Sequence, residues 1–60
     1  MSIDEKRNIL KQTGVRQKRA AQIIGISPQY LSEYLNNKRL LSTQEMIRLD
    51  NYFDKLRAIL

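Results

Sequence analysis

The chain has 60 residues, of which eleven are basic and six are acidic, so its formal net charge at neutral pH is +5. A chain of this length forms at most one domain and buries too little surface for a large core. It contains no cysteine and no histidine, which excludes disulfides, thiolate metal sites and histidine-based nucleophilic catalysis. The longest apolar run has three residues, far fewer than a membrane span requires. We therefore expect a cytoplasmic binding module rather than an enzyme, with no cofactor, no membrane contact and no small-molecule ligand.

The positive charge is concentrated in the middle of the chain. Residues 15–39 hold five basic residues and a single acidic one, Glu33, whereas basic and acidic residues balance in residues 40–60. Such a cluster indicates a polyanionic partner. Small basic proteins that bind no polyanion also exist, so the charge alone leaves both readings open.

Helix signals begin at the first residues, and no stretch alternates apolar and polar residues as a strand does. Ser2 with Glu5 three residues later forms the pattern of a capping box, and Gly14 is suited to end that helix in the left-handed conformation. A second helix is predicted over residues 17–23. Its inward side is formed by small and branched residues: Ala20, Ala21 and Ile24.

A tight turn and a third helix follow. Gly25 supplies the turn because glycine adopts positive φ without a Cβ penalty. Ser27 is suited to cap the next helix and Pro28 to occupy its first position. This helix is predicted to run to residue 35 or 36 and to end at Asn36-Asn37. The residues expected to face inward are Leu31, Tyr34 and Leu35.

The last helix is predicted to be the longest. Ser42 and Glu45 repeat the capping-box pattern, and no glycine or proline interrupts the chain from there to Leu60. Its apolar residues recur at helical spacing and form one stripe: Met46, Leu49, Phe53, Leu56 and Leu60. We predict an all-α fold of four helices, a single domain over residues 1–60. It contains a helix-turn-helix at about 17–36 and a core and dimerisation helix at about 43–60.

Two short helices joined by a glycine-centred turn form a helix-turn-helix. Residues 16–41 resemble the phage repressor and Cro type of this motif, also called the xenobiotic-response-element family. The family's pattern is matched at Gln17, Ala21, Gly25-Ile26-Ser27, Leu31-Ser32 and Asn36-Asn37-Lys38-Arg39. Two positions depart from it: Pro28 replaces a polar residue, and Asn37 stands where glycine is common. The resemblance implies a sequence-specific transcription regulator that binds double-stranded DNA, with a recognition helix over residues 28–36.

The resemblance also implies roles for individual residues. Gln29 would read adenine through its amide, and Glu33 would accept a hydrogen bond from cytosine N4. The other positions expected at the base edges are Ser27, Pro28 and Ser32. Contacts with backbone phosphates are expected from the residues around both ends of the motif: Gln17, Lys18, Arg19, Tyr30, Asn36, Lys38 and Arg39.

Most of these residues also have a purely structural interpretation. Gln29 and Ser32 could be solvated surface, and Glu33 could pair with Arg39 in solvent. Tyr30 could pack on the second helix. The cations of the motif could be no more than a solvated face: Lys18, Arg19, Lys38 and Arg39.

The end of the fourth helix carries more apolar residues than three short helices can cover. Exposed apolar residues at a chain end commonly mark an interface, and a small domain gains stability by dimerising. We therefore predict a homodimer interface at Tyr52, Leu56, Ile59 and Leu60. The setting that fits is a repressor of a phage or mobile element that acts on a short inverted repeat. The alternative is an antitoxin or co-repressor module that binds another regulatory protein through the fourth helix.

Overall fold

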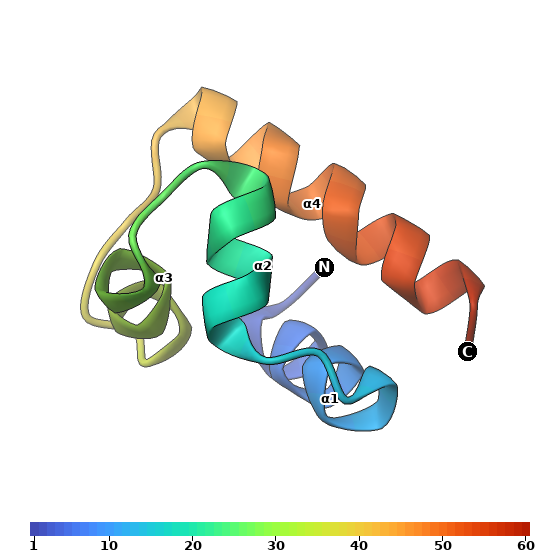
Figure 1. The fold of residues 1–60 in the computed structure, drawn as a ribbon. Coiled ribbons are helices and arrows are strands. Elements are labelled where there is room, and N and C mark those ends of the chain that lie inside the picture. Colours follow the sequence, from blue (N-terminus) through green and yellow to red (C-terminus); the bar gives the residue numbers. More distant parts are fainter.

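The computed structural model describes residues 1–60 and consists of four helices without strands, which confirms the predicted all-α fold. The helices are α1 (Ile3–Thr13), α2 (Gln17–Ile24), α3 (Pro28–Leu35) and α4 (Thr43–Ala58). Figure 1 shows α2 standing between α4 and α1, with α3 to one side. None of the helices combines the length and the apolar composition that crossing a bilayer requires.

Three of the four helices begin with a serine cap, as predicted. The hydroxyl oxygens of Ser2 and Ser42 accept from the amides of Glu5 and Glu45, at 3.1 and 3.2 Å. In turn, the backbone amides of Ser2 and Ser42 donate to the carboxylates of Glu5 and Glu45, which completes two capping boxes. These backbone bonds are the main reason why the pKa values of both carboxyls lie below their ordinary value. The side chain of Ser27 accepts from the amide of Tyr30 at 3.0 Å.

The helix ends also follow the predicted signals, with small shifts. Gly14 and Gly25 end α1 and α2 with φ of 73° and 88°, and Asn37 adopts φ 61° after α3. The second helix extends one residue beyond its predicted end. The last helix stops at Ala58 instead of continuing to Leu60. Its final amides bond three residues back, which is the tighter turn in which helices commonly end.

Two arginines from neighbouring helices bind the carbonyl ends of α2 and α3. Arg48 of α4 donates from Nε to the carbonyl oxygen of Ile24, at 3.0 Å. Arg7 of α1 donates from Nη1 to the carbonyl oxygen of Leu35, at 3.2 Å. Both bonds satisfy carbonyls that have no partner within their own helix.

The core contains all the inward residues predicted for α2 and α3. Its members are Ile9, Leu10, Ala20, Ala21, Ile24, Leu31, Tyr34, Leu35, Leu49, Phe53 and Leu56. The prediction that Leu56 lies beyond the monomer's core is wrong, because only 8% of this residue is exposed. The reason is that α4 packs along α1, so the core reaches further toward the C-terminus than expected. Tyr52 is partly buried against the same core, whereas Ile59 and Leu60 are 76% and 56% exposed.

A lysine completes the core, which the sequence did not reveal. Lys6 is 1% exposed, and its ammonium donates to the hydroxyl of Tyr34 at 2.8 Å. The same Nζ lies 3.1 Å from a carboxylate oxygen of Asp50. Desolvation lowers the pKa of Lys6, but the bonds with Tyr34 and Asp50 outweigh it, and the pKa lies above its ordinary value. The ammonium thus joins α1, α3 and α4.

Candidate nucleic-acid interface

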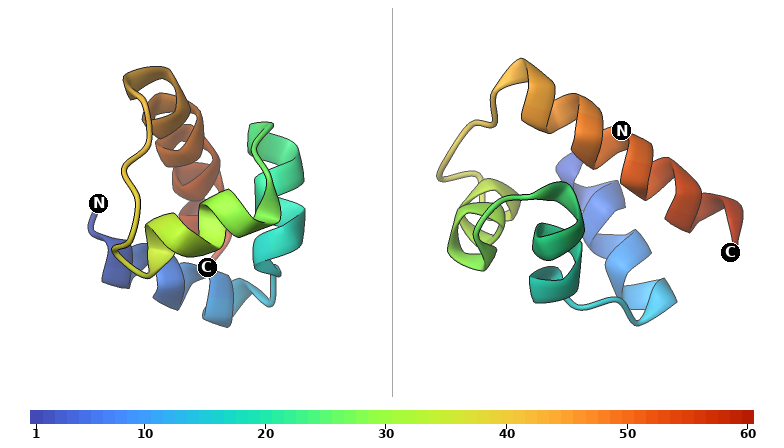
Figure 2. Two further views of the ribbon diagram at one scale, coloured as in Figure 1. Left: turned by 90° about the vertical axis from the view of Figure 1, so that its left-hand side faces the viewer. Right: turned by 45° about the horizontal axis from the view of Figure 1, so that its top comes forward.

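The turn between α2 and α3 fixes how the third helix is presented. The amides of Gly25 and Ile26 both donate to the carbonyl oxygen of Ala21, at 2.9 and 3.1 Å. The side chain of Ala21 is fully buried, and Ile26 packs against the core. The left view of Figure 2 shows α3 lying across one face of the molecule, in front of the other helices. One side of α3 is therefore buried, and the opposite side is available to a partner.

The outward side of α3 carries two of the predicted base-contacting residues. Gln29 and Glu33 are four residues apart and so lie on the same side of the helix. Gln29 is exposed, and its amide forms no hydrogen bond within the protein. Pro28 is exposed beside it, at the first helical position. Ser32 is half-buried. This side of the helix is a polar surface, and the side-chain amide of Gln29 near its start is free to bind a partner.

Five predicted contact residues surround one shallow depression of about 320 Å³: Ser27, Gln29, Tyr30, Glu33 and Arg39. Within it, Nε of Arg39 lies 2.7 Å from a carboxylate oxygen of Glu33. The ion pair that was an alternative for Glu33 is thus present. The guanidinium of Arg39 also lies over the ring of Tyr30, 4.9 Å from its centroid. The depression therefore holds an arginine that contacts both Glu33 and Tyr30.

The hydroxyl of Tyr30 has polar partners within the protein. Its hydroxyl donates to the carboxylate of Glu45 at 2.8 Å and lies 3.3 Å from the carbonyl oxygen of Leu40. Its polar contacts are therefore with α4 and the preceding loop, and not with the second helix. The bond to Glu45, with burial second, raises the pKa of Tyr30 above its ordinary value. Its hydroxyl is thus engaged before any phosphate approaches.

Asn36 uses both ends of its amide within the protein. Its Nδ2 donates to the carbonyl oxygen of Ser32 at 2.8 Å, and its Oδ1 accepts from Arg7 at 3.2 Å. The residue thus closes the end of α3 together with Arg7. No local sequence pattern points to this arginine, because the contact joins residues 29 positions apart.

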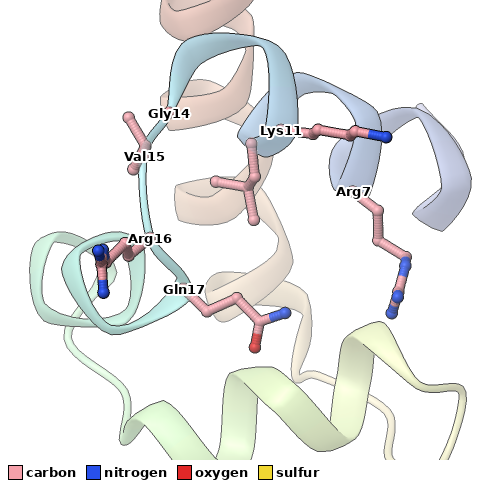
Figure 3. Close-up of a pocket in the computed structure, with 7 residues that line it drawn as sticks. Arg7, Lys11, Gly14, Val15, Arg16 and Gln17 are labelled. Carbon is pink, nitrogen blue, oxygen red and sulfur yellow. The ribbon is translucent and has the colours of Figure 1, made fainter.

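A second group of polar residues surrounds the start of α2. Gln17 lines a depression of about 510 Å³ together with Arg7, Lys11 and Arg16 (Figure 3). In Figure 3 the side chains of Gln17 and Arg7 point toward α3, whereas that of Arg16 points away. Arg16 occupies the N-cap position and forms no side-chain bond to the helix. The positive end of the α2 dipole is thus surrounded by cations, which is an arrangement that attracts anions.

The remaining predicted cations are separate from this group. Lys18 and Arg19 are exposed on α2 and line neither depression. Lys38 is exposed in the loop after α3, and its backbone amide donates to the carbonyl oxygen of Glu33 at 2.8 Å. The sequence analysis assigned no contact to Arg7, Lys11 or Arg16. Their four-residue spacing places Arg7 and Lys11 on one side of α1, but only the packing shows that this side adjoins the start of α2.

Comparison with known proteins agrees with this geometry. The sequence model of the helix-turn-helix family matches residues 6–58, which include most of all four helices. No curated protein and no solved structure matches the chain. The family consists of DNA-binding regulatory domains and not of enzymes. The chain belongs to the phage repressor and Cro type of helix-turn-helix family and is a DNA-binding transcription regulator.

Proposed function

We propose that the protein is a sequence-specific repressor that inserts α3 into the major groove of duplex DNA. The observation that carries the proposal is the free, outward-facing side-chain amide of Gln29 on α3. Beside α3, the neighbouring helix α2 begins in a depression lined by cations. A major groove about 12 Å wide admits one α-helix. A protein bound at its operator would block transcription because it occupies that site.

In this proposal the contacts divide by chemistry. Gln29 bonds adenine N6 and N7, with Ser27, Pro28 and Ser32 beside it at the base edges. Gln17 and the first amides of α2 bind one phosphate, and exposed cations bind its neighbours: Lys18, Arg19 and Lys38. Tyr30 and Asn36 contribute less to phosphate binding, because their polar groups already have partners in the protein.

The dimensions of the molecule favour binding as a homodimer. Its longest extent is 27 Å, whereas successive major grooves on one face of DNA are about 34–36 Å apart. One copy therefore reaches one half-site, and an inverted repeat needs two. Residues 1–60 act as a single domain in this scheme. The exposed Ile59 and Leu60, together with the partly buried Tyr52, join the two copies.

Selection of a randomised duplex library on the purified protein at physiological salt tests the proposal. We expect enrichment of an inverted repeat whose half-site centres lie about one helical turn apart. Enrichment of a single half-site would contradict the homodimer and leave DNA recognition intact. Retention that depends on salt and enriches no sequence would contradict sequence-specific binding.

The last of these outcomes would favour the second candidate function, a protein-binding module of the antitoxin or co-repressor kind. The observation in its favour is the exposure of Ile47, Ile59 and Leu60 on α4 and just beyond it, at 55%, 76% and 56%. In that case DNA binding would need the partner protein. Adding the partner should then restore sequence preference in the same selection.

A further inference from the structure

The side chain of Arg39 returns to the recognition helix, although the residue follows that helix in the chain. Asn37 turns the chain with φ 61°, and the amide of Lys38 donates back to the carbonyl oxygen of Glu33 at 2.8 Å. The left view of Figure 2 shows the loop rising from the end of α3 toward the start of α4. This turn brings Arg39 beside Tyr30 and Glu33, in the depression that Gln29 and Ser27 also line.

The guanidinium is held in a way that leaves one edge free. Its Nε is 2.7 Å from Oε1 of Glu33, and neither terminal nitrogen forms a hydrogen bond within the protein. Its Cζ atom lies over the ring of Tyr30, 4.9 Å from the ring centroid. The two terminal nitrogens form the edge that can bond guanine O6 and N7 together. The contacts with Glu33 and Tyr30 thus restrain the guanidinium and leave its bidentate edge open.

The charges support the same reading. An isolated carboxylate on the outward side of α3 would be repelled by DNA phosphates, but the Glu33–Arg39 pair is neutral as a unit. An ion pair this exposed contributes little to stability. Its structural effect is to orient the guanidinium. Lys38 forms no such pair and remains a flexible cation of the kind suited to a phosphate.

We propose that Arg39 reads a guanine in the major groove and that Glu33 is the residue that positions it. The inference rests on the proposed function of α3 as the recognition helix. It replaces the phosphate contact expected for Arg39 from the sequence with a base contact. It also replaces the base contact expected for Glu33 with a role that acts through Arg39.

The test uses the full chain and the preferred site from the library selection, together with a panel in which each base pair is changed in turn. Arg39→Ala should lose discrimination at one G·C pair by about 5-fold to 150-fold while keeping the preferences at the other positions. Lys38→Ala is the matched control and should weaken binding to all sites by the same factor. Replacing the same guanine by 7-deazaguanine, which lacks N7, should weaken DNA binding by the unaltered protein and leave DNA binding by Arg39→Ala unchanged.

The positioning role has its own readout. Glu33→Gln should reduce discrimination at the same G·C pair, and the double variant should lose no more there than Arg39→Ala alone. A Glu33→Gln effect at a different base pair would overturn the positioning role. If Arg39→Ala weakens all sites alike, as Lys38→Ala does, the base contact is overturned although the regulator remains sequence-specific. A protein with no preferred site would overturn this inference and the proposed function together.

Discussion

In our proposal, the exposed side-chain amide of Gln29 is the group that recognises an adenine. We expect Gln29→Ala to lose about 1–3 kcal/mol of discrimination at one A·T pair, because a bidentate amide contact disappears. Non-specific binding should persist, since the cations around α2 are unchanged. Competition binding with single-base variants of the preferred site measures both quantities.

Gln44→Ala is the control for this substitution, because Gln44 is also exposed on a helix but lies outside the polar depressions. It should leave the preferred site unchanged. A Gln29→Ala protein with an unaltered preference at every position would show that the base-reading side of α3 is assigned incorrectly.

Lys6 shows that a charged side chain can be part of a core when its partners are present. Replacing it with methionine keeps most of its volume but leaves the Tyr34 hydroxyl and the Asp50 carboxylate without their donor. We expect Lys6→Met to lower the free energy of unfolding by about 1–3 kcal/mol, less than for a fully buried pair because the Asp50 side chain is 41% exposed. Urea denaturation measures the change.

Lys55→Met provides the comparison for Lys6, because Lys55 is exposed on the same helix as Asp50. Its free energy of unfolding should stay close to that of the unaltered protein. Equal effects of the two substitutions would mean that the buried ammonium contributes nothing specific.

At the scale of the elements, the two capping boxes make α1 and α4 sensitive to acid. The pKa values of Glu5 and Glu45 lie below the ordinary 4.5 in the folded protein, chiefly because the amides of Ser2 and Ser42 donate to their carboxylates. A carboxyl with a lowered folded pKa stabilises the fold above its unfolded pKa and loses that contribution as the pH falls through the folded value. Both contributions should therefore be present above pH 4.5 and disappear below it.

The double variant Glu5→Gln/Glu45→Gln tests this pH dependence. Glutamine can keep the capping-box bond but does not titrate. The stability of the variant should therefore fall less steeply below pH 4.5 than that of the unaltered protein. Thermal unfolding followed by circular dichroism between neutral and acid pH gives both curves. Two curves of equal slope in acid would count against the assignment.

The same elements show which features a sequence can predict. The starts of α1, α3 and α4 were predictable because their serine caps act within three residues. The turn at Gly25 was predictable because its signal is also local: a glycine that adopts positive φ. The contacts of Lys6 and Arg7 with Tyr34, Asp50 and Asn36 join residues at least 28 positions apart, so no local pattern contains them. The pairing of Glu33 with Arg39 spans six residues and was foreseen only as an alternative.

The exposure of Leu56 was mispredicted for a related reason. Helical spacing places this residue on the apolar side of α4 but does not say how far along the helix the core extends. That length depends on the angle at which α1 crosses α4. The packing buries Leu56 and leaves only Ile59 and Leu60 largely exposed. The dimer interface that we propose is consequently smaller than the one expected from the sequence.

For the whole molecule, we expect self-association through this C-terminal end. Analytical ultracentrifugation at tens of micromolar should give twice the mass of one chain, and the melting temperature should rise with protein concentration. Ile59→Asp should shift the protein toward the monomer, because a carboxylate would be placed in the interface. Ile47→Asp is the control, since Ile47 is similarly exposed on α4 but lies nearer its start. A single-chain mass at this concentration would contradict the homodimer.

The two arginines that bind the carbonyl ends of α2 and α3 both lie outside the stretch that resembles the family most closely. Arg7 reaches in from one side of residues 16–41 and Arg48 from the other. The motif is thus held at its ends by the helices before and after it. A peptide of residues 16–41 would lack both guanidinium groups as well as the core residues of α1 and α4. The helix-turn-helix of this protein therefore cannot be transferred to another scaffold as a linear segment, because its conformation depends on contacts with α1 and α4.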